Sequence, residues 1–146
     1  MKKRLHYLFP LLIAALVAPG GAKAHAQIVG AIEADIPFPF YVGSGKFPAG
    51  KYYFRETDAV NASVMEISSV DGKTSGLFDT LESRDKTLPQ ATELIFSHLR
   101  DRYFLTKLYD REDRYGASAI DAGYSKKYKA ATEGSEFKHV PAVHTK

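Results

Sequence analysis

The stretch that decides the fold reads ADIPFPFYVGSGKFPAGKYYF and runs from Ala34 to Phe54. Successive side chains of a β-strand point to opposite faces of the sheet. In the first part of this stretch the even-numbered positions are all apolar, namely Ala34, Ile36, Phe38, Phe40 and Val42. This alternation predicts a strand whose even positions face a core.

Two prolines, Pro37 and Pro39, occupy the opposite face of this strand. Proline has no backbone N–H to donate to a neighbouring strand. A strand with two prolines is therefore expected at the edge of a sheet, or in irregular pairing. Pro37 and Pro39 mark a candidate edge for contact with a partner chain.

The alternation stops and then resumes in the second half of the stretch. Residues suited to turns occur at Gly43–Lys46 and again at Phe47–Gly50. A second strand is expected at Lys51–Glu56, with Tyr52 and Phe54 on one face. The stretch therefore predicts a strand, a bent connection and a second strand.

Four aromatic residues on these two strands form a candidate ligand-binding set: Phe38, Phe40, Tyr52 and Phe54. Aromatic rings on an accessible sheet face or in a cavity stack on a sugar or a base. Aromatic residues at every second position of a strand belong more often to a core. Both interpretations, a core and an aromatic platform, stay open at this point.

Two hairpins are expected further along the chain. Each consists of two alternating segments joined by a short turn: Ser63–Val70 and Thr74–Leu81 around Asp71-Gly72, and Thr92–Leu99 and Arg102–Asp110 around Arg100-Asp101. Asp-Gly between two such segments is a strong hairpin signal. Beyond the hairpins, Tyr115–Ile120 is expected to add a strand and Asp121–Ala131 a short helix.

These elements predict a single all-β domain with a minor helical segment near the carboxy terminus. The expected architecture is an antiparallel β-sandwich or a small closed β-barrel of about six to eight strands, within residues 27–131. Residues 132–146 have few apolar side chains and include Gly134 and Pro141, so we expect a mobile tail there.

Residues 1–26 have the pattern of a secretory signal peptide. A basic start, Met1–Arg4, precedes an apolar run, Leu5–Val17, and small residues follow. The run is shorter than the roughly 20 residues that span a membrane. We expect cleavage after Ala26, with cleavage after Ala24 or an uncleaved amino-terminal anchor as alternatives. The mature protein is then periplasmic or extracellular and has no transmembrane span.

Removal of the signal changes the charge balance. The whole chain has 20 Lys and Arg against 17 Asp and Glu, and four of the basic residues but no acidic residue lie in residues 1–26. The mature chain is close to neutral, which gives no support for nucleic-acid binding. The chain has no cysteine. The mature domain of about 120 residues therefore has to be stabilised by its hydrophobic core, without disulfides.

The deciding stretch resembles the opening of a family of small secreted bacterial β proteins of uncharacterised function. The shared pattern is Ile36-Pro37-Phe38-x-Phe40, then Val42-Gly43, then Pro48-Ala49-Gly50-x-Tyr52. The family's two hairpins are similar to Asp71-Gly72-Lys73 and to Leu94-x-Phe96 followed by Asp101-x-Tyr103-Phe104-Leu105. The resemblance covers Ala34 to Tyr109 and implies export and the β fold, without an activity to transfer. Arg100 stands where the family pattern has glycine.

No catalytic or metal-binding motif is present in the sequence. The histidines His98, His139 and His144 lack the spacing of a metal-binding motif, and there is no cysteine ligand. Ser44 lies in a turn-forming Gly-Ser-Gly, and nothing in the sequence pairs it with His98. We therefore expect no metal, no cofactor and no catalytic residues.

Two charged groups offer alternatives to this expectation. Glu33 and Asp35 share one strand face about 7 Å apart, which is in the range of glycosidase carboxylate pairs. A solubilising strand face is the simpler interpretation of this pair. The second group either contacts an anionic surface or forms a solvated helix face; it consists of Lys126, Lys127 and Lys129.

The sequence favours an exported, non-catalytic protein that binds an unknown ligand or an envelope protein through its β domain. A structural or assembly protein that pairs through an edge strand is the first alternative. A hydrolase that uses carboxylates such as Glu33 and Asp35 is the second.

Overall fold

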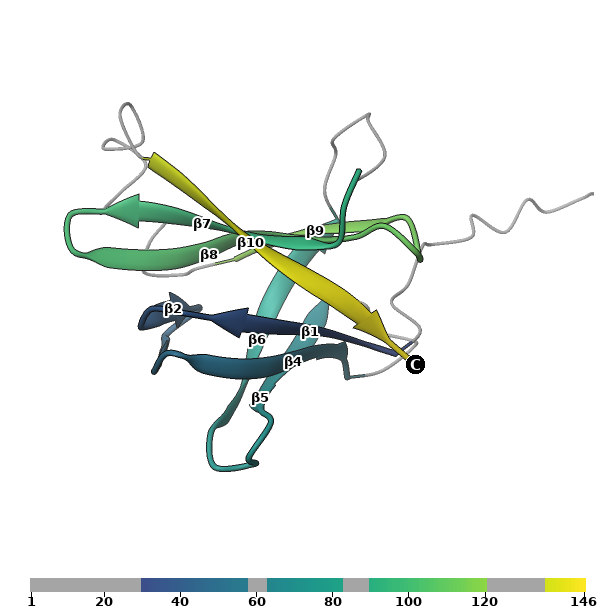
Figure 1. Ribbon diagram of the computed structural model, residues 1–146, viewed down its shortest axis with the longest axis horizontal. Coiled ribbons are helices and arrows are strands. Elements are labelled where there is room, and N and C mark those ends of the chain that lie inside the picture. Colours follow the sequence, from purple (N-terminus) through teal and green to yellow (C-terminus); the bar gives the residue numbers. More distant parts are fainter. Residues whose placement is uncertain (1–29, 58–62, 83–89, 121–135) are drawn as a thin grey trace, which may run out of the picture.

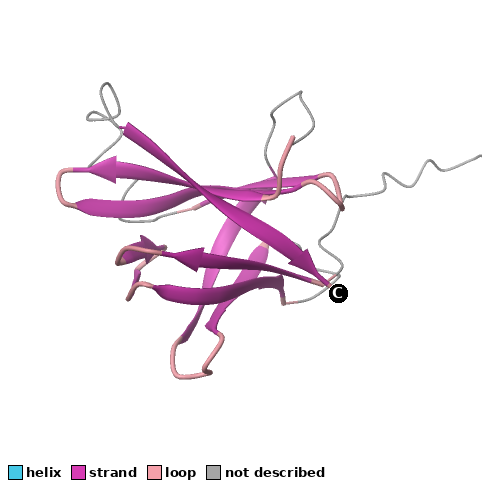
Figure 2. Ribbon diagram, viewed as in Figure 1, coloured by secondary structure: helices cyan, strands magenta, loops and turns pink. Residues whose placement is uncertain are grey.

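A computed structural model describes residues 30–57, 63–82, 90–120 and 136–146 (Figure 1). This part of the chain consists of strands and loops, with no helix among the described residues (Figure 2). The strands are β1 (Ala31–Ile36), β2 (Phe40–Val42), β3 (Gly45–Phe47), β4 (Gly50–Glu56), β5 (Val64–Ser69), β6 (Ser75–Glu82), β7 (Glu93–Leu99), β8 (Arg102–Asp110), β9 (Tyr115–Ala119) and β10 (Glu136–Thr145). The helix expected at Asp121–Ala131 lies outside the described residues.

Eight of the strands close into an antiparallel β-barrel. Their order is β8-β7-β10-β1-β4-β5-β6-β9, and β9 pairs with β8 to complete the circle. The all-β prediction is confirmed, and of the two expected architectures the barrel is the one formed. Both predicted hairpins are confirmed as β5–β6 and β7–β8, and the strand expected at Tyr115–Ile120 is β9.

Two strands join the layers of the barrel by changing partners along their length. β10 pairs with β7 from Glu136 to Pro141 and with β1 from Ala142 to Thr145. β6 pairs with β5 over its first part and with β9 over Thr80–Glu82. In Figure 1, β10 accordingly crosses diagonally between the layer with β7 and β8 and the layer with β1 and β4.

The expectation of a mobile carboxy-terminal tail is wrong for residues 136–146, which contain β10. The low apolar content misled the prediction because only one face of β10 is buried, and Val140, with 4% of its surface exposed, is the one fully buried residue of the strand. Pro141 is tolerated because it lies where β10 leaves β7 and begins to pair with β1.

Of the two expectations for the proline-bearing strand, the edge strand is wrong and the irregular pairing is closer to what forms. The chain divides at the prolines into two strands, and Pro37 and Pro39 lie exposed in the link between β1 and β2. β1 pairs with both β10 and β4, whereas β2 pairs with β3 and in parallel with the start of β8. Proline suits the link because neither residue has to donate a ladder hydrogen bond there.

The β2–β3 hairpin completes the wall of the barrel. β2 pairs with β8 at Tyr103 and Phe104, whereas β9 pairs with the later part of β8, from Lys107 to Asp110. Both use the edge of β8 that faces away from β7. The hairpin therefore covers the part of β8 that β9 does not reach, and it carries Phe40 and Phe47 into the core.

Side chains from every strand fill the interior of the barrel. Phe40 lies near the centre and contacts the rings of Phe47, Tyr52 and Phe96 at centroid distances of 5.5, 5.2 and 5.5 Å. Full burial of one such side chain contributes about 1.5–3 kcal/mol. The even positions of the deciding stretch face this core as expected, with Phe38 only partly buried.

A β-bulge in β8 changes which residues face inward. Phe96 lies opposite Leu105, but Ile95 lies opposite Lys107, so Thr106 is an extra residue in the ladder. The Thr106 hydroxyl donates a hydrogen bond to the carbonyl of Ile95 at 2.9 Å. Because of this extra residue, both Leu105 and Leu108 are buried, and the final residue of β8, Asp110, is buried as well.

The placement of β10 predicts that one substitution has unequal effects on stability at two positions on opposite faces of the strand. Val140→Asp puts a carboxylate into the core, and we expect it to lower the free energy of unfolding by about 3 kcal/mol or more. Val143→Asp places the same group on the outer face, where 58% of Val143 is exposed and Glu33 lies across the ladder, and should lower it by less than about 1 kcal/mol. Urea denaturation of both variants measures the difference, and equal effects would contradict the register of β10.

Candidate functional sites: a surface cleft and a buried histidine cluster

The aromatic set predicted from the sequence belongs mostly to the core. Phe40, Tyr52 and Phe54 have 0%, 1% and 0% of their surface exposed. Phe38 closes one end of the core, where its ring stacks on Tyr103 at 3.9 Å between centroids. These residues therefore do not form an exposed platform, and the core interpretation of their alternation is the one that the structure supports.

The carboxylate pair lies on the outside of the barrel. Glu33 and Asp35 alternate with the buried residues of β1, and Asp35 lies across from Lys51 of β4. The surface has a cleft beside Tyr52, described below, and a second pocket that includes Tyr53 and Arg55. Neither carboxylate lines either of them. The pair therefore has the surroundings of a solvated strand face.

The other candidate groups from the sequence are dispersed. His98 stacks on Tyr103 at 4.4 Å between centroids, and His139 contacts Glu93 at 3.0 Å. Ser44 lies exposed in the turn between β2 and β3. The lysine cluster lies outside the described residues. The structure thus places His98 and His139 in separate contacts on different strands.

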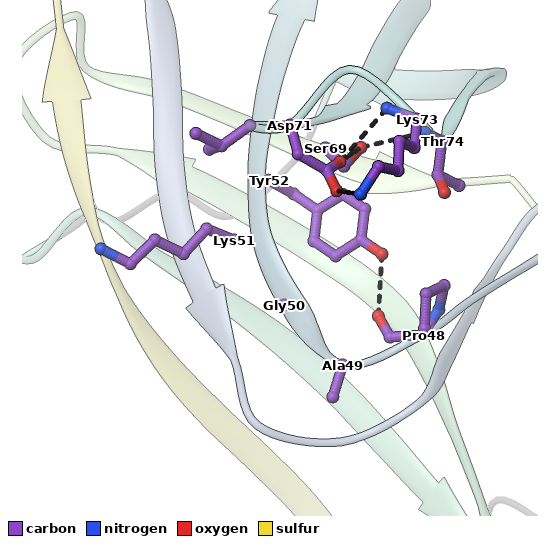
Figure 3. A pocket seen from close by; sticks show the side chains of 10 residues that line it. Pro48, Ala49, Gly50, Lys51, Tyr52, Ser69, Asp71, Lys73 and Thr74 are labelled. Atoms are coloured by element: carbon purple, nitrogen blue, oxygen red, sulfur yellow. Dashed lines mark hydrogen bonds and ion pairs between the residues drawn. The ribbon is translucent and has the colours of Figure 1, made fainter.

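A surface cleft of about 480 Å³ lies beside the first residues of β4 (Figure 3). One wall is the chain from Pro48 to Tyr52, and the other is the turn of the β5–β6 hairpin, from Ser69 to Thr74. The Tyr52 hydroxyl donates a hydrogen bond to the carbonyl of Pro48 at 2.8 Å, which holds the first wall against the core.

Asp71 organises the second wall of the cleft. Its carboxylate accepts hydrogen bonds from the Ser69 hydroxyl at 2.7 Å and from the Lys73 backbone N–H at 3.2 Å, and its other oxygen contacts the Lys73 ammonium at 3.2 Å. Gly72 has a φ of 72°, a conformation that glycine adopts without steric cost. The hydrogen bond from Ser69 and those from Lys73 lower the pKa of Asp71 to about 2.

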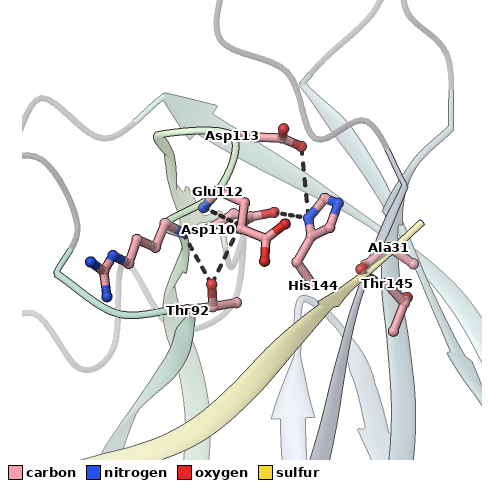
Figure 4. Close-up of polar contacts among 8 residues, drawn as sticks. Ala31, Thr92, Asp110, Glu112, Asp113, His144 and Thr145 are labelled. Carbon is pink, nitrogen blue, oxygen red and sulfur yellow. Dashed lines mark hydrogen bonds and ion pairs between the residues drawn. The ribbon is translucent and has the colours of Figure 1, made fainter.

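A second group of polar side chains is buried where β8, β10 and the β8–β9 turn meet (Figure 4). The Nδ1 atom of His144 lies 2.7 Å from an Oδ2 atom of Asp110 and 3.8 Å from Oδ2 of Asp113. The side chains of His144 and Asp110 are 4% and 0% exposed. The hydrogen bond with Asp110 raises the pKa of His144, against the opposing effect of burial.

Backbone and side-chain donors hold the Asp110 carboxylate in place. Its Oδ1 atom accepts hydrogen bonds from the Glu112 backbone N–H at 3.0 Å and from the Thr92 hydroxyl at 3.4 Å. The Thr145 hydroxyl donates to the carbonyl of Ala31 at 3.0 Å and so fixes the end of β10 next to His144. Oδ2 of Asp110 is thereby directed at the imidazole.

Sequence reasoning missed this cluster for two reasons. Both faces of Arg102–Asp110 carry apolar residues, so alternation alone leaves the inner face open, and the bulge at Thr106 places Leu105, Leu108 and Asp110 all inward. The tail expected over residues 132–146 puts His144 outside any strand. The alternation of Val140, Ala142 and His144 is a signal that would have placed this histidine on the inner face.

No family model, curated protein or solved structure matches the chain. Within the described residues, no helix has the length and apolar character needed to cross a membrane. The candidate sites therefore rest on their own geometry.

The low pKa of Asp71 predicts a pH-dependent contribution to stability. A carboxyl whose pKa is lower in the folded state stabilises the fold above its unfolded pKa of about 3.9. This stabilisation is lost as the pH falls through about 2. We expect Asp71→Asn to be less stable than the wild type at pH 6 and the difference to shrink between pH 4 and pH 2. A difference that stays constant over this range in thermal unfolding would contradict the assignment.

The buried hydrogen bond between His144 and Asp110 predicts a large cost for removal of the Asp110 charge. Asp110→Asn takes the charged acceptor away from the imidazole, and we expect the free energy of unfolding to fall by about 3 kcal/mol. Asp79→Asn makes the same change at an exposed position of β6 and should cost less than about 0.5 kcal/mol. Chemical denaturation of both variants, in a buffer with a chelator, tests this ranking.

Proposed function

We propose that the mature protein is an exported, non-catalytic binding protein whose cleft beside Tyr52 holds a small hydroxyl-rich ligand, such as a saccharide. The signal pattern in residues 1–26 supports export to the periplasm or the outside of the cell. The observation that carries the binding role is the cleft itself, whose volume of about 480 Å³ is in the usual range for small-molecule sites.

The position of the cleft follows from the packing of the barrel. The interior is occupied by rings such as Phe40, Phe54 and Phe96, each with 0% exposure. A ligand therefore has to bind at the outer surface or at an end of the barrel. The cleft lies between two loops at the ends of strands, where binding residues are commonly found.

The chemistry of the lining fits a saccharide. Asp71 is an acceptor that stays ionised because its pKa is about 2, and Lys73 beside it is a donor. Paired donors and acceptors of this kind bind vicinal hydroxyl groups. Pro48, Ala49 and Val70 supply apolar surface for the C–H face of a sugar ring.

Native mass spectrometry of the mature protein, purified from its own envelope fraction, is the first test. We expect a bound species with the mass of a small saccharide. NMR titration of labelled protein with a panel of envelope oligosaccharides should then shift the backbone resonances of Pro48–Tyr52 and Ser69–Thr74 in a saturable manner. Ligand-free protein together with an absence of saturable shifts would contradict the proposal.

A matched pair of variants locates the binding. Asp71→Asn removes the acceptor charge from the cleft, and we expect the apparent affinity to fall at least about tenfold, as for loss of a charged hydrogen-bonding partner. Asp101→Asn makes the same change in the exposed turn of the other hairpin and should leave the affinity unchanged. Equal affinities in the two variants would place the ligand elsewhere.

A second function, as an assembly protein, is supported by one observation. β3 stands at the end of the strand order, and among the described residues it pairs through one edge only, with β2. Strand addition from a partner chain would use the free edge of Gly45–Phe47. A Lys46→Pro variant blocks such pairing, and loss of a co-purified protein from this variant would favour assembly over ligand binding.

A further inference from the structure

We propose that His144, Asp110 and Asp113 form a binding site for a divalent transition-metal ion. Each residue offers one ligand atom, and the three atoms all lie within 4.8 Å of one another. An imidazole nitrogen with two carboxylate oxygens is a ligand set that Zn²⁺ and related ions accept. The two carboxylates also balance the charge of a divalent ion.

The distances between the ligand atoms suit an ion placed among them. Two ligands that are each about 2.0–2.2 Å from one ion, at tetrahedral or octahedral angles, are about 2.8–3.6 Å apart. The His144 nitrogen is 2.7 Å from the Asp110 oxygen and 3.8 Å from the Asp113 oxygen, one value slightly below this range and one slightly above. Movement of the partly exposed Asp113 side chain shortens the longer distance. The shorter distance has to widen by a few tenths of an ångström when the ion displaces the proton between His144 and Asp110.

The surroundings hold two of the three ligands in the required orientation. Oδ1 of Asp110 is held by Glu112 and Thr92, as described above, which leaves Oδ2 toward the imidazole. Hydrogen bonds of this kind to the outer atoms of a ligand raise metal affinity. The imidazole is anchored by β10, whose last residues are bonded to β1. Asp113 is 22% exposed, so an ion can enter from its side.

Binding of the ion replaces the hydrogen bond between His144 and Asp110. The Nδ1 atom donates its proton to Asp110 in the metal-free protein and has to give it up to bind the ion. A charged imidazole loses the Nδ1 proton to solvent and keeps the proton on Nε2. A neutral imidazole changes tautomer, so that Nε2 takes up a proton as Nδ1 loses one. The ion then links β10 to the β8–β9 turn, so binding should stabilise the closed barrel.

Isothermal titration of the metal-free, full-length mature protein with ZnCl₂ tests the proposal. We expect one ion per chain and a melting temperature that rises with the concentration of free Zn²⁺. When CoCl₂ replaces ZnCl₂, the bound Co²⁺ should show visible d–d absorption bands stronger than those of the hydrated ion. NMR of the imidazole nitrogens should show the ion on Nδ1 of His144. The absence of saturable binding would overturn the proposal and leave a buried ion pair only.

Two variants distinguish this site from other metal contacts. Asp113→Asn removes a ligand charge and leaves the Asp110–His144 ion pair, so the variant should fold and bind Zn²⁺ at least about tenfold more weakly. His139→Gln removes the exposed histidine of the same strand, which contacts Glu93, and should bind as tightly as the wild type. Equal affinity in the two variants, or loss of binding only in His139→Gln, would overturn the assignment.

Discussion

Backbone hydrogen bonding along β10 is the constraint on which the rest of the structure depends. The first part of this strand completes the layer that contains β7, and the last part completes the layer that contains β1. A sheet closed in this way leaves few unpaired edges, which protects the protein from strand-to-strand aggregation. The change of partners also explains how ten residues, only one of them fully buried, can hold the two layers together.

The closed wall and the aromatic core determine where chemistry can take place. Because large rings occupy the interior, the polar groups of interest lie at the ends of strands. Gly50 of the cleft lies across from Ile36 of β1, whereas His144 lies across from Ile32 of the same strand. The two candidate sites are therefore separated along β1, and a saccharide in one and an ion in the other would act independently or through the stability of the barrel.

Single-residue features of the backbone adapt this simple architecture. The extra residue at Thr106 allows β8 to bury Leu105 and Leu108 and also brings Asp110 to His144. Arg100 takes a φ of 55° in the β7–β8 turn, a conformation that glycine adopts most readily. The turn keeps its two-residue length with this left-handed, non-glycine residue, so the hairpin register does not require glycine at that position.

The sequence by itself determined the strands that alternate and the turns that join them. The side-chain period of two and the residues of the short turns are local properties, so the pattern groups Phe40 with Ile36 and Val42, groups Tyr52 with Phe54, and predicts the hairpin at Asp71-Gly72. Only the tertiary structure decided that the sheet closes, that the chain divides at Pro37 and that residues 136–146 contain a wall strand. It alone brought His144 to Asp110. These outcomes depend on hydrogen bonds and contacts between residues far apart in the chain, which no local pattern encodes.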